Sequence, residues 1–505
     1  MWAPPASDPK PHWVTATTAE RPAPPGVRVL LGALLTGAVA AAVLVEGAGV
    51  NLLLFALAAA VAAGSAAVAR GRRPRPWTLV WGFSAFALLL VPVLSDAGWP
   101  SFLAFVAAVG SAALALHGGR RWPAVLLAPL GLGLHAFSVL PWLVRGLRAR
   151  PVPSARRVLP VVRTVLVTGG LLVVFGALFA SADAAVGELV DSLVPSIDLG
   201  ELPVRAVLFA FGTGVALVAA HTAAAPRRFD RLPLWPGRER GRAEWAVPML
   251  ALNLLFGGFV AVQAVVFFGG YEAVMSKPGL VPAEYARQGF WQLLWVTVLA
   301  LAVVALAQRW APRRTASDRL LGKGLTGLLC VLTLVVVASA YYRMQRYVDV
   351  FGLTRLRVTV TAAELWLGAV FVLVLIAVLA GARVARLLPR VVALSAVAGV
   401  AAFGLVRPDA LIAEQNVTRF ERLDTIDLAY LSSLSADAVP ALDRLTGERR
   451  TCALQAIAVS LEGRPTPWYA ASLSEGRARE LLRERPVDLR ADCDSSRYPA
   501  GGELP

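Results

Sequence analysis

Apolar stretches of membrane-spanning length fill most of residues 27–406. A bilayer core about 30 Å thick needs about 20 apolar residues in a helix, and only helices or closed barrels satisfy their backbone polar groups there. A barrel strand would alternate in polarity, whereas these stretches are continuously apolar and rich in Ala, Leu and Val. We therefore predict an all-α fold, a polytopic transmembrane helix bundle of about eleven or twelve spans. The clearest stretches are Val27–Val45, Thr164–Ala182, Val247–Phe268, Leu325–Ala340 and Leu365–Leu379.

Composition excludes the soluble classes of protein. The chain is 57% hydrophobic and 16% charged, which exceeds the apolar content that a soluble core requires. Its net charge of +16 comes largely from arginines in short loops between spans, where the positive-inside rule expects them. The charge therefore indicates topology, and no nucleic-acid partner is expected. The preference for Arg over Lys, with abundant Ala, Gly and Pro, suggests a GC-rich bacterial genome.

Three regions follow from the hydropathy. Residues 1–26 are polar and rich in proline, so we expect a disordered cytoplasmic tail. Residues 27–406 form the transmembrane bundle. Residues 407–505 are expected to form a small, mainly helical soluble domain in which Ser435 and Ser472 cap helices. Arginine counting predicts a multi-pass protein of the bacterial cell membrane with a cytoplasmic N-terminus and an extracytoplasmic C-terminal tail.

One segment leaves the number of spans open. If residues 123–143 cross fully, the arginines from Arg145 to Arg163 fall outside, against the charge rule. The segment contains Pro129, Gly131 and Gly133, so a re-entrant or surface-lying helix is the alternative. That alternative gives eleven crossings, and a full span gives twelve.

The cysteines leave a second question open. Cys452 and Cys493 both lie in the tail, whereas Cys330 is alone inside a span. A disulfide between the tail cysteines is compatible with an oxidising compartment, and two free thiols are the alternative.

Motifs for catalysis are missing from the sequence. The four histidines lack the spacing of metal ligands, and neither HExxH nor paired CxxC motifs occur. The cluster Gly322, Lys323 and Gly324 lacks the spacing of a phosphate-binding loop. No catalytic residue, metal or cofactor is predicted, and a non-enzymatic role is favoured without being decided.

Three polar residues inside spans are candidates for function. Asn253 and Gln263 lie ten residues apart, within about 80° of each other on a helix. They can bridge neighbouring helices or line a substrate path. Glu364 lies just inside a span, where an ionisable group is a functional candidate unless it extends to the interface.

Two stretches of charged and aromatic residues are candidates for interfacial contacts. Glu284, Tyr285 and Arg287 precede a span and fit an interfacial belt. Residues 341–357 could lie in the interface and be divided by Gly352. Their arginines could bind anionic lipids or pair with Glu284, Asp349, Glu364 or the acidic residues of the tail. The charged and aromatic candidates in this stretch are Arg343, Arg346, Tyr347, Asp349, Arg355 and Arg357.

Four of these stretches carry a family resemblance. They are LNLLFGGFVAVQAVVFFGG (252–270), EYARQGFWQL (284–293), RYVDVFGLTRLR (346–357) and DLAYLSSLSADAVPAL (427–442). In this order they resemble the signature segments of a domain-of-unknown-function family of multi-spanning bacterial membrane proteins, common in actinobacteria. The resemblance covers roughly residues 160–505. It implies an integral membrane protein and supplies no catalytic residue.

Three functional classes remain open. The absence of catalytic motifs favours a non-catalytic cell-envelope scaffold or sensor, whose partners are the lipid bilayer and an envelope protein. A secondary transporter would need a polar cavity that joins Asn253, Gln263 and Glu364. A lipid-binding protein or lipid-linked transferase would need an outer groove lined by the arginines of residues 341–357.

Overall fold

The computed structural model describes residues 22–148, 168, 201–232, 241–268, 282–312, 314–463 and 466–493. These residues form helices, turns and loops, and none of them is in a strand. Ten of the described helices are long and apolar enough to cross a membrane. The all-α polytopic prediction is therefore confirmed. The apolar segment 164–182, except for residue 168, and nearly all of residues 1–26 lie outside the described part of the chain.

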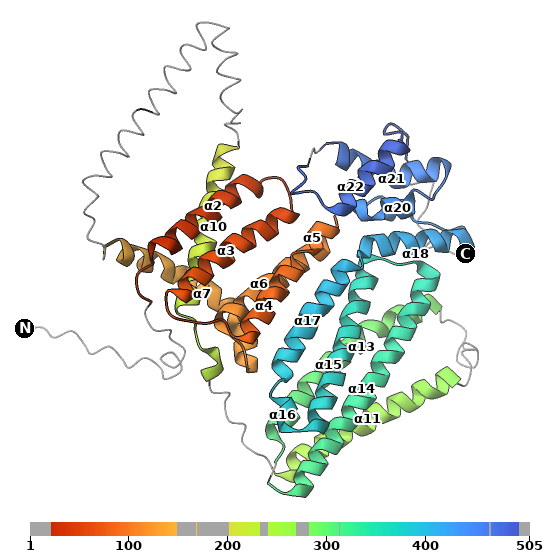
Figure 1. Cartoon of the computed structure of the whole chain (residues 1–505). Helices are drawn as coiled ribbons and strands as arrows, with labels where there is room; N and C mark the ends of the chain where they lie inside the picture. Colours follow the sequence, from red (N-terminus) through yellow and green to blue (C-terminus); the bar gives the residue numbers. More distant parts are fainter. Residues whose placement is uncertain are drawn as a thin grey trace, which may run out of the picture.

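The first half of the bundle contains residues 27–224, and Figure 1 shows its helices in red to yellow. Most of its helices run antiparallel to their neighbours and are joined by short loops. The helices are α2 (Val27–Val43), α3 (Val50–Val68), α4 (Pro76–Leu88), α5 (Val91–Leu94), α6 (Gly98–His117), α7 (Trp122–Arg148) and α10 (Leu202–Ala224).

The second half packs beside the first through α17, which contacts α6 and α4. Its central pair is α14 and α15, with α11 and α13 packed against α14. The helices are α11 (Arg242–Phe268), α13 (Pro282–Trp310), α14 (Ala316–Phe351), α15 (Arg355–Ala380), α16 (Ala382–Ala385) and α17 (Leu388–Leu405).

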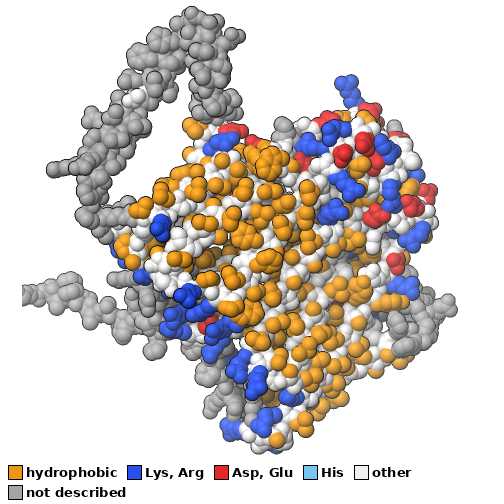
Figure 2. Space-filling model, in the orientation of Figure 1, with side chains coloured by type: hydrophobic (Ala, Val, Ile, Leu, Met, Phe, Trp, Pro, Cys, Tyr) orange, Lys and Arg blue, Asp and Glu red, His pale blue; other side chains and the backbone are white. Residues whose placement is uncertain are grey.

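The loops collect at two ends of the bundle, which we call the arginine end and the tail end. At the arginine end, Arg72 donates to the carbonyl of Ala223 at 3.2 Å, and Arg390 donates to the carbonyl of Gly119 at 2.7 Å. At the tail end, the backbone N–H of Asn51 donates to the carbonyl of Tyr469 at 2.9 Å. Figure 2 shows the Lys and Arg side chains of the bundle gathered along its lower edge, with an apolar surface above them.

Close packing in the first half depends on small residues where α2 crosses α10. A Cβ atom on Gly37 would lie 2.7 Å from the carbonyl oxygen of Phe209, and one on Gly212 would lie 2.6 Å from Cβ of Ala40. The two backbones approach this closely only because both positions are glycine. The helices α2, α3 and α10 therefore form one tight group.

Helix α7 does not run parallel to its neighbours. Its beginning lies at the arginine end, where the backbone N–H groups of Arg120 and Arg121 donate to Asp230. The C-terminal part of α7 also lies at the arginine end, because Trp142 donates to the carbonyl of Ala23, just before α2, at 2.7 Å. Figure 1 shows α7 running crosswise to α4 and α6. This arrangement supports the surface-lying interpretation of residues 123–143, although α7 is long enough to span.

The tail lies on the tail end of the bundle and does not hang free (Figure 1). Its apolar core includes Ile412, Leu442 and Leu454, and it continues into Met344 and Val348 of α14. Ser472 caps α22 by accepting from the N–H of Glu475, as predicted, whereas the predicted cap at Ser435 was wrong, because its hydroxyl makes no capping hydrogen bond to η2. The tail helices are α18 (Pro408–Leu423), α19 (Leu428–Leu431), η2 (Ala436–Ala438), α20 (Val439–Leu442), α21 (Gly447–Glu462) and α22 (Leu473–Glu484).

Candidate functional site

A buried polar site joins the tail to both halves of the bundle, and we call it the tail clamp. Its centre is Asp409, at the start of α18, which is fully buried. Arg355, the first residue of α15, donates to the carboxylate through Nε at 3.0 Å and through a terminal nitrogen at 2.6 Å. Trp99 of α6 donates at 3.1 Å and the backbone N–H of Ser435 at 3.0 Å. One carboxylate therefore connects α6, α15 and two parts of the tail.

A second carboxylate pair completes the tail clamp. Asp437 of η2 accepts from the hydroxyl of Ser95 and, at 3.1 Å, from the backbone N–H of Asp96. Asp96 in turn accepts from the backbone N–H of Ala436 at 3.1 Å. The loop between α5 and α6 and the start of η2 therefore exchange hydrogen bonds in both directions.

The pKa values of two clamp carboxylates, Asp409 and Asp96, are shifted in opposite directions. Burial would raise the pKa of Asp409, but the hydrogen bonds from Arg355, Trp99 and the Ser435 backbone lower it below its usual range. The pKa of Asp96 is raised, chiefly by burial, and the negative charge of Asp437 adds to the increase while the Ala436 N–H opposes it. Asp409 is therefore held as a carboxylate, and Asp96 takes up a proton more readily.

The arginine-rich residues 341–357 form the corner between α14 and α15. Residues 341–351 complete α14, which ends at Phe351. The next residue, Gly352, has a φ of 73°, which is readily adopted only by glycine. Arg357 donates to the carbonyls of Phe351 and Gly352 and stacks over the ring of Tyr347 at 4.4 Å. Arg357 therefore holds the corner together. Gly352 divides the stretch as the sequence indicated, but the first piece belongs to a long helix.

The other candidates at this corner are peripheral to the clamp. Arg346 donates to the hydroxyl of Tyr342 one turn earlier, at 3.1 and 3.0 Å. Arg343 is half-buried and Asp349 is exposed. The side chains of Glu284, Tyr285 and Arg287, in the first turns of α13, lie outside the described residues.

The intramembrane amides join α11 to α14. Asn253 is buried and donates to the carbonyl of Met249 at 2.8 Å and to that of Leu325 at 3.1 Å. Gln263 accepts from the hydroxyl of Ser339 at 3.4 Å. These contacts are the interhelical bridges that the sequence offered as one interpretation.

Glu364 is fully buried on the inner face of α15, and neither carboxyl oxygen has a hydrogen-bond partner in the described structure. Val360, Leu367 and Phe371 are buried on the same face. A carboxyl group without partners in an apolar bundle is costly when it is ionised. Glu364 lacks the interhelical hydrogen bond that Asn253 makes, so it stays a separate candidate.

Three histidines come together although the sequence separates them. The Nδ1 atoms of His135 and His221 lie 2.8 Å apart, and the rings of His117 and His135 are 5.5 Å apart. Their spacing along the chain gave no sign of this, because they come from α6, α7 and α10. Across the described ranges, no three His, Cys, Asp or Glu side chains are grouped to hold a metal ion.

The tail cysteines are joined in the structure. Cys452 on α21 and Cys493 are bonded, with their Cα atoms 5.4 Å apart. The bridge fastens the segment after α22 to the tail core. Formation of this disulfide in the cell stays a prediction, because it depends on the compartment.

These features define a multi-pass integral membrane protein with a helical tail packed on one end of its bundle. The chain belongs to the DUF4153 family, a domain of unknown function, whose model matches residues 82–445. This confirms the resemblance to a family of unknown function, although the match begins at residue 82 and not near 160, and ends before the C-terminal 60 residues. No curated protein and no solved structure matches the chain.

Proposed function

We propose that this protein is a non-catalytic cell-envelope scaffold or sensor whose tail faces the outside of the cell. The tail clamp carries the proposal. Asp409 and Asp437 bind the α5–α6 loop of the first half and the α14–α15 corner of the second half. A partner that binds the tail would therefore act on both halves together, since a displaced tail breaks contacts to each of them.

The proposed orientation follows from the two ends of the bundle. The positive-inside rule assigns the arginine end to the cytoplasm, and the tail end then lies outside. Because both ends of α7 lie at the arginine end, residues 122–148 add no crossing. Eleven crossings result if residues 164–182 make one, and an actinobacterial cell envelope remains the proposed setting.

An envelope protein is the proposed partner, and the part of the tail that packs beside the α2–α3 loop offers it an aromatic contact. Trp468 is 78% exposed, and its ring lies 5.9 Å from that of Tyr469. Nearby Leu473 is 65% exposed. Exposed aromatic residues are enriched at protein interfaces, which favours this surface for docking.

Photocrosslinking in living cells tests the proposal. A photoreactive phenylalanine analogue at position 468 is expected to give one discrete protein adduct, whereas the same analogue at Leu423, which is also exposed, gives none. The adduct should be lost when Asp409→Ala releases the tail although the chain remains in the membrane. Adducts with lipid alone, or equal protein adducts at both positions, would contradict the scaffold proposal.

Transport is the second candidate, and Glu364 is the observation that favours it. A buried carboxyl without partners can take up and release a proton as the bundle rearranges. Glu364→Gln keeps the shape of the side chain and removes its charge. A transporter would lose proton-coupled uptake in this variant, whereas a scaffold would keep its adduct at position 468.

A further inference from the structure

A long slot separates two groups of helices in the first half of the bundle. Helix α3 packs on α2 and α10, whereas α4 packs on α6, and the slot lies between the two groups. Its volume is about 1970 Å³. Pockets for small molecules usually hold about 300–1,000 Å³, so the slot has room for a larger ligand.

The slot follows the depth of the membrane. Its lining along α3 extends from Leu52 to Val68, which is roughly 24 Å at a rise of 1.5 Å per residue. The walls are almost entirely apolar side chains, among them Phe55, Phe105 and Leu140. Acyl chains are the ligand that matches an apolar slot of this length.

Glycines in the slot differ from those between α2 and α10. Gly64, Gly82 and Gly214 line the slot, and a Cβ atom at each would meet nothing within 4 Å. At Gly37 and Gly212 the same added atom would clash with the neighbouring helix. The slot glycines therefore keep space open and do not serve helix packing.

Arginines surround the slot at the arginine end. The lining includes Arg72, Arg73, Arg75, Arg120, Arg228 and Arg231. Among the ion pairs of the described residues, none includes Arg73, Arg75 or Arg228. The carboxylate of Asp230, also in the lining, accepts from backbone N–H groups. The rim is therefore strongly positive, and an anionic group would complement it.

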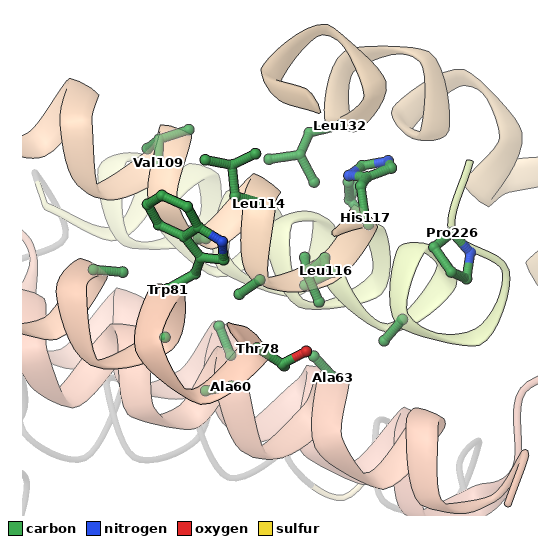
Figure 3. A pocket seen from close by; sticks show the side chains of 18 of the residues that line it. Ala60, Ala63, Thr78, Trp81, Val109, Leu114, Leu116, His117, Leu132 and Pro226 are labelled. Carbon is green, nitrogen blue, oxygen red and sulfur yellow. The ribbon is translucent and has the colours of Figure 1, made fainter. Parts of the chain in front are cut away.

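Two polar atoms on the slot wall, one from Trp81 and one from His117, lack hydrogen-bond partners in the described structure. Trp81 of α4 is 1% exposed, and its indole N–H has no hydrogen-bond acceptor in the described structure. The Nε2 atom of His117 on α6 is likewise buried without a partner. Figure 3 shows both among the lining side chains, with Leu114 of α6 drawn between them. A buried N–H donor without an acceptor is costly, and an ester carbonyl would satisfy it.

We propose that the slot binds an anionic phospholipid, with its acyl chains between α3 and α4 and its phosphate among the rim arginines. The Trp81 indole then donates to an oxygen of the glycerol ester region. Charge complementarity selects an anionic headgroup over a zwitterionic one, and the apolar length selects a lipid over a free phosphate. This site lies in a different half of the bundle from the arginine-rich residues 341–357, and it does not depend on the scaffold proposal.

Native mass spectrometry of the detergent-solubilised full chain tests the site. Phosphatidylglycerol and phosphatidylcholine with identical acyl chains are the two probes, and glycerol phosphate is the headgroup-only probe. The wild-type chain is expected to retain phosphatidylglycerol in preference to phosphatidylcholine and to bind no glycerol phosphate. Arg73→Gln with Arg228→Gln should weaken phosphatidylglycerol binding about thirtyfold, since each arginine near an anionic surface contributes about a factor of five.

Matched variants distinguish binding in the slot from a general loss of positive charge or an added side chain elsewhere. Arg383→Gln with Arg386→Gln removes two exposed arginines of the same end outside the slot lining, and it should leave binding unchanged. Gly82→Leu places a bulky side chain in the slot at a position where an added Cβ atom meets nothing within 4 Å, and it should abolish lipid retention, whereas Gly110→Leu, outside the lining, should not. Equal retention of both lipids, equal losses in both arginine pairs, or full retention by Gly82→Leu would each overturn the proposal.

Discussion

The arginine of the tail clamp and the arginines around the slot differ in burial and in pairing. At the tail end, Arg355 and Asp409 are paired, and the carboxylate is completely buried. At the arginine end, Arg73 and Arg228 are exposed and belong to no ion pair among the described residues. Arginine therefore fixes tertiary contacts at both ends, since Arg242 pairs with the buried Asp318 at the arginine end, whereas Arg73 and Arg228 offer their charge to the proposed ligand.

This difference shows that an arginine count does not distinguish a structural site from a topological one. Burial and pairing make the distinction. Removing a buried partner leaves an uncompensated charge, which costs much more free energy than removing an exposed arginine. Substitutions at the two ends should therefore differ strongly in their effect on stability.

The largest effect is expected at the centre of the tail clamp. Asp409→Ala leaves Arg355 without its carboxylate and removes the acceptor of Trp99, so the free energy of unfolding should fall by about 3–5 kcal/mol. Thermal unfolding of the full chain in detergent measures the loss. Arg386→Gln at the arginine end is the control, with an expected change below about 0.5 kcal/mol. Equal changes in the two variants would remove the distinction between the ends.

Loss of the tail disulfide should rank second. Cys452 and Cys493 are 41 residues apart, and opening a loop of that length costs about 2–4 kcal/mol through the entropy of the unfolded chain. Cys493→Ser should lower the unfolding midpoint of the tail by a corresponding amount, and reductant should lower that of the wild type equally. Cys330→Ser tests a cysteine outside the tail. An unchanged midpoint in Cys493→Ser would show that the bridge does not form.

The clamp should respond to pH with opposite signs at its two carboxylates. The raised pKa of Asp96 means that the folded chain binds more protons than the unfolded chain between the ordinary value of 3.8 and the raised value. Stability from this group is present below that window and is lost as the pH rises through it. Asp96→Asn should therefore be more stable than the wild type at neutral pH, and the difference should disappear below pH 3.8.

Asp409 supplies the contrast to Asp96. Its lowered pKa contributes stability above the ordinary pKa of 3.8, and this is lost as the pH falls through the lowered value. Asp409→Asn should therefore be less stable than the wild type at neutral pH. Unfolding midpoints of the two Asn variants between pH 3 and pH 7 check both signs. A loss of stability in Asp96→Asn at neutral pH would contradict a raised pKa of Asp96 in the folded chain.

The smallest effect is expected inside the bundle. Asn253→Leu removes the bond to the carbonyl of Leu325, and such interhelical bonds contribute about 0.6 kcal/mol on average in a membrane protein. The unpartnered Oδ1 of Asn253 disappears too, which offsets part of the loss. Gln263→Leu should change stability less, because its bond to Ser339 is 3.4 Å long. A loss above about 2 kcal/mol in either variant would point to a polar path.

Hydropathy predicted the helices because a long apolar run indicates a segment inside the bilayer core, where the backbone must be helical. The identity of one residue predicted the division at Gly352, since glycine interrupts a helix locally. Neither signal could predict which residues lie next to each other in the folded protein. Trp99 and Asp409 are 310 positions apart, and Ser95 and Asp437 are 342 apart. The clamp, the histidine cluster and the slot all depend on which helices pack together, and a single sequence does not specify that pairing.

Thiol labelling of intact cells with a membrane-impermeant reagent tests the assignment of the two ends most directly. Labelled peptides of the wild type and of Arg145→Cys, at the far end of α7, are identified by mass spectrometry, with buried Cys330 as the internal control. We expect Cys452 and Cys493 to be labelled in intact cells only after reduction, and residue 145 only after lysis. Labelling of residue 145 in intact cells, or of the tail cysteines only after lysis, would contradict the proposed orientation.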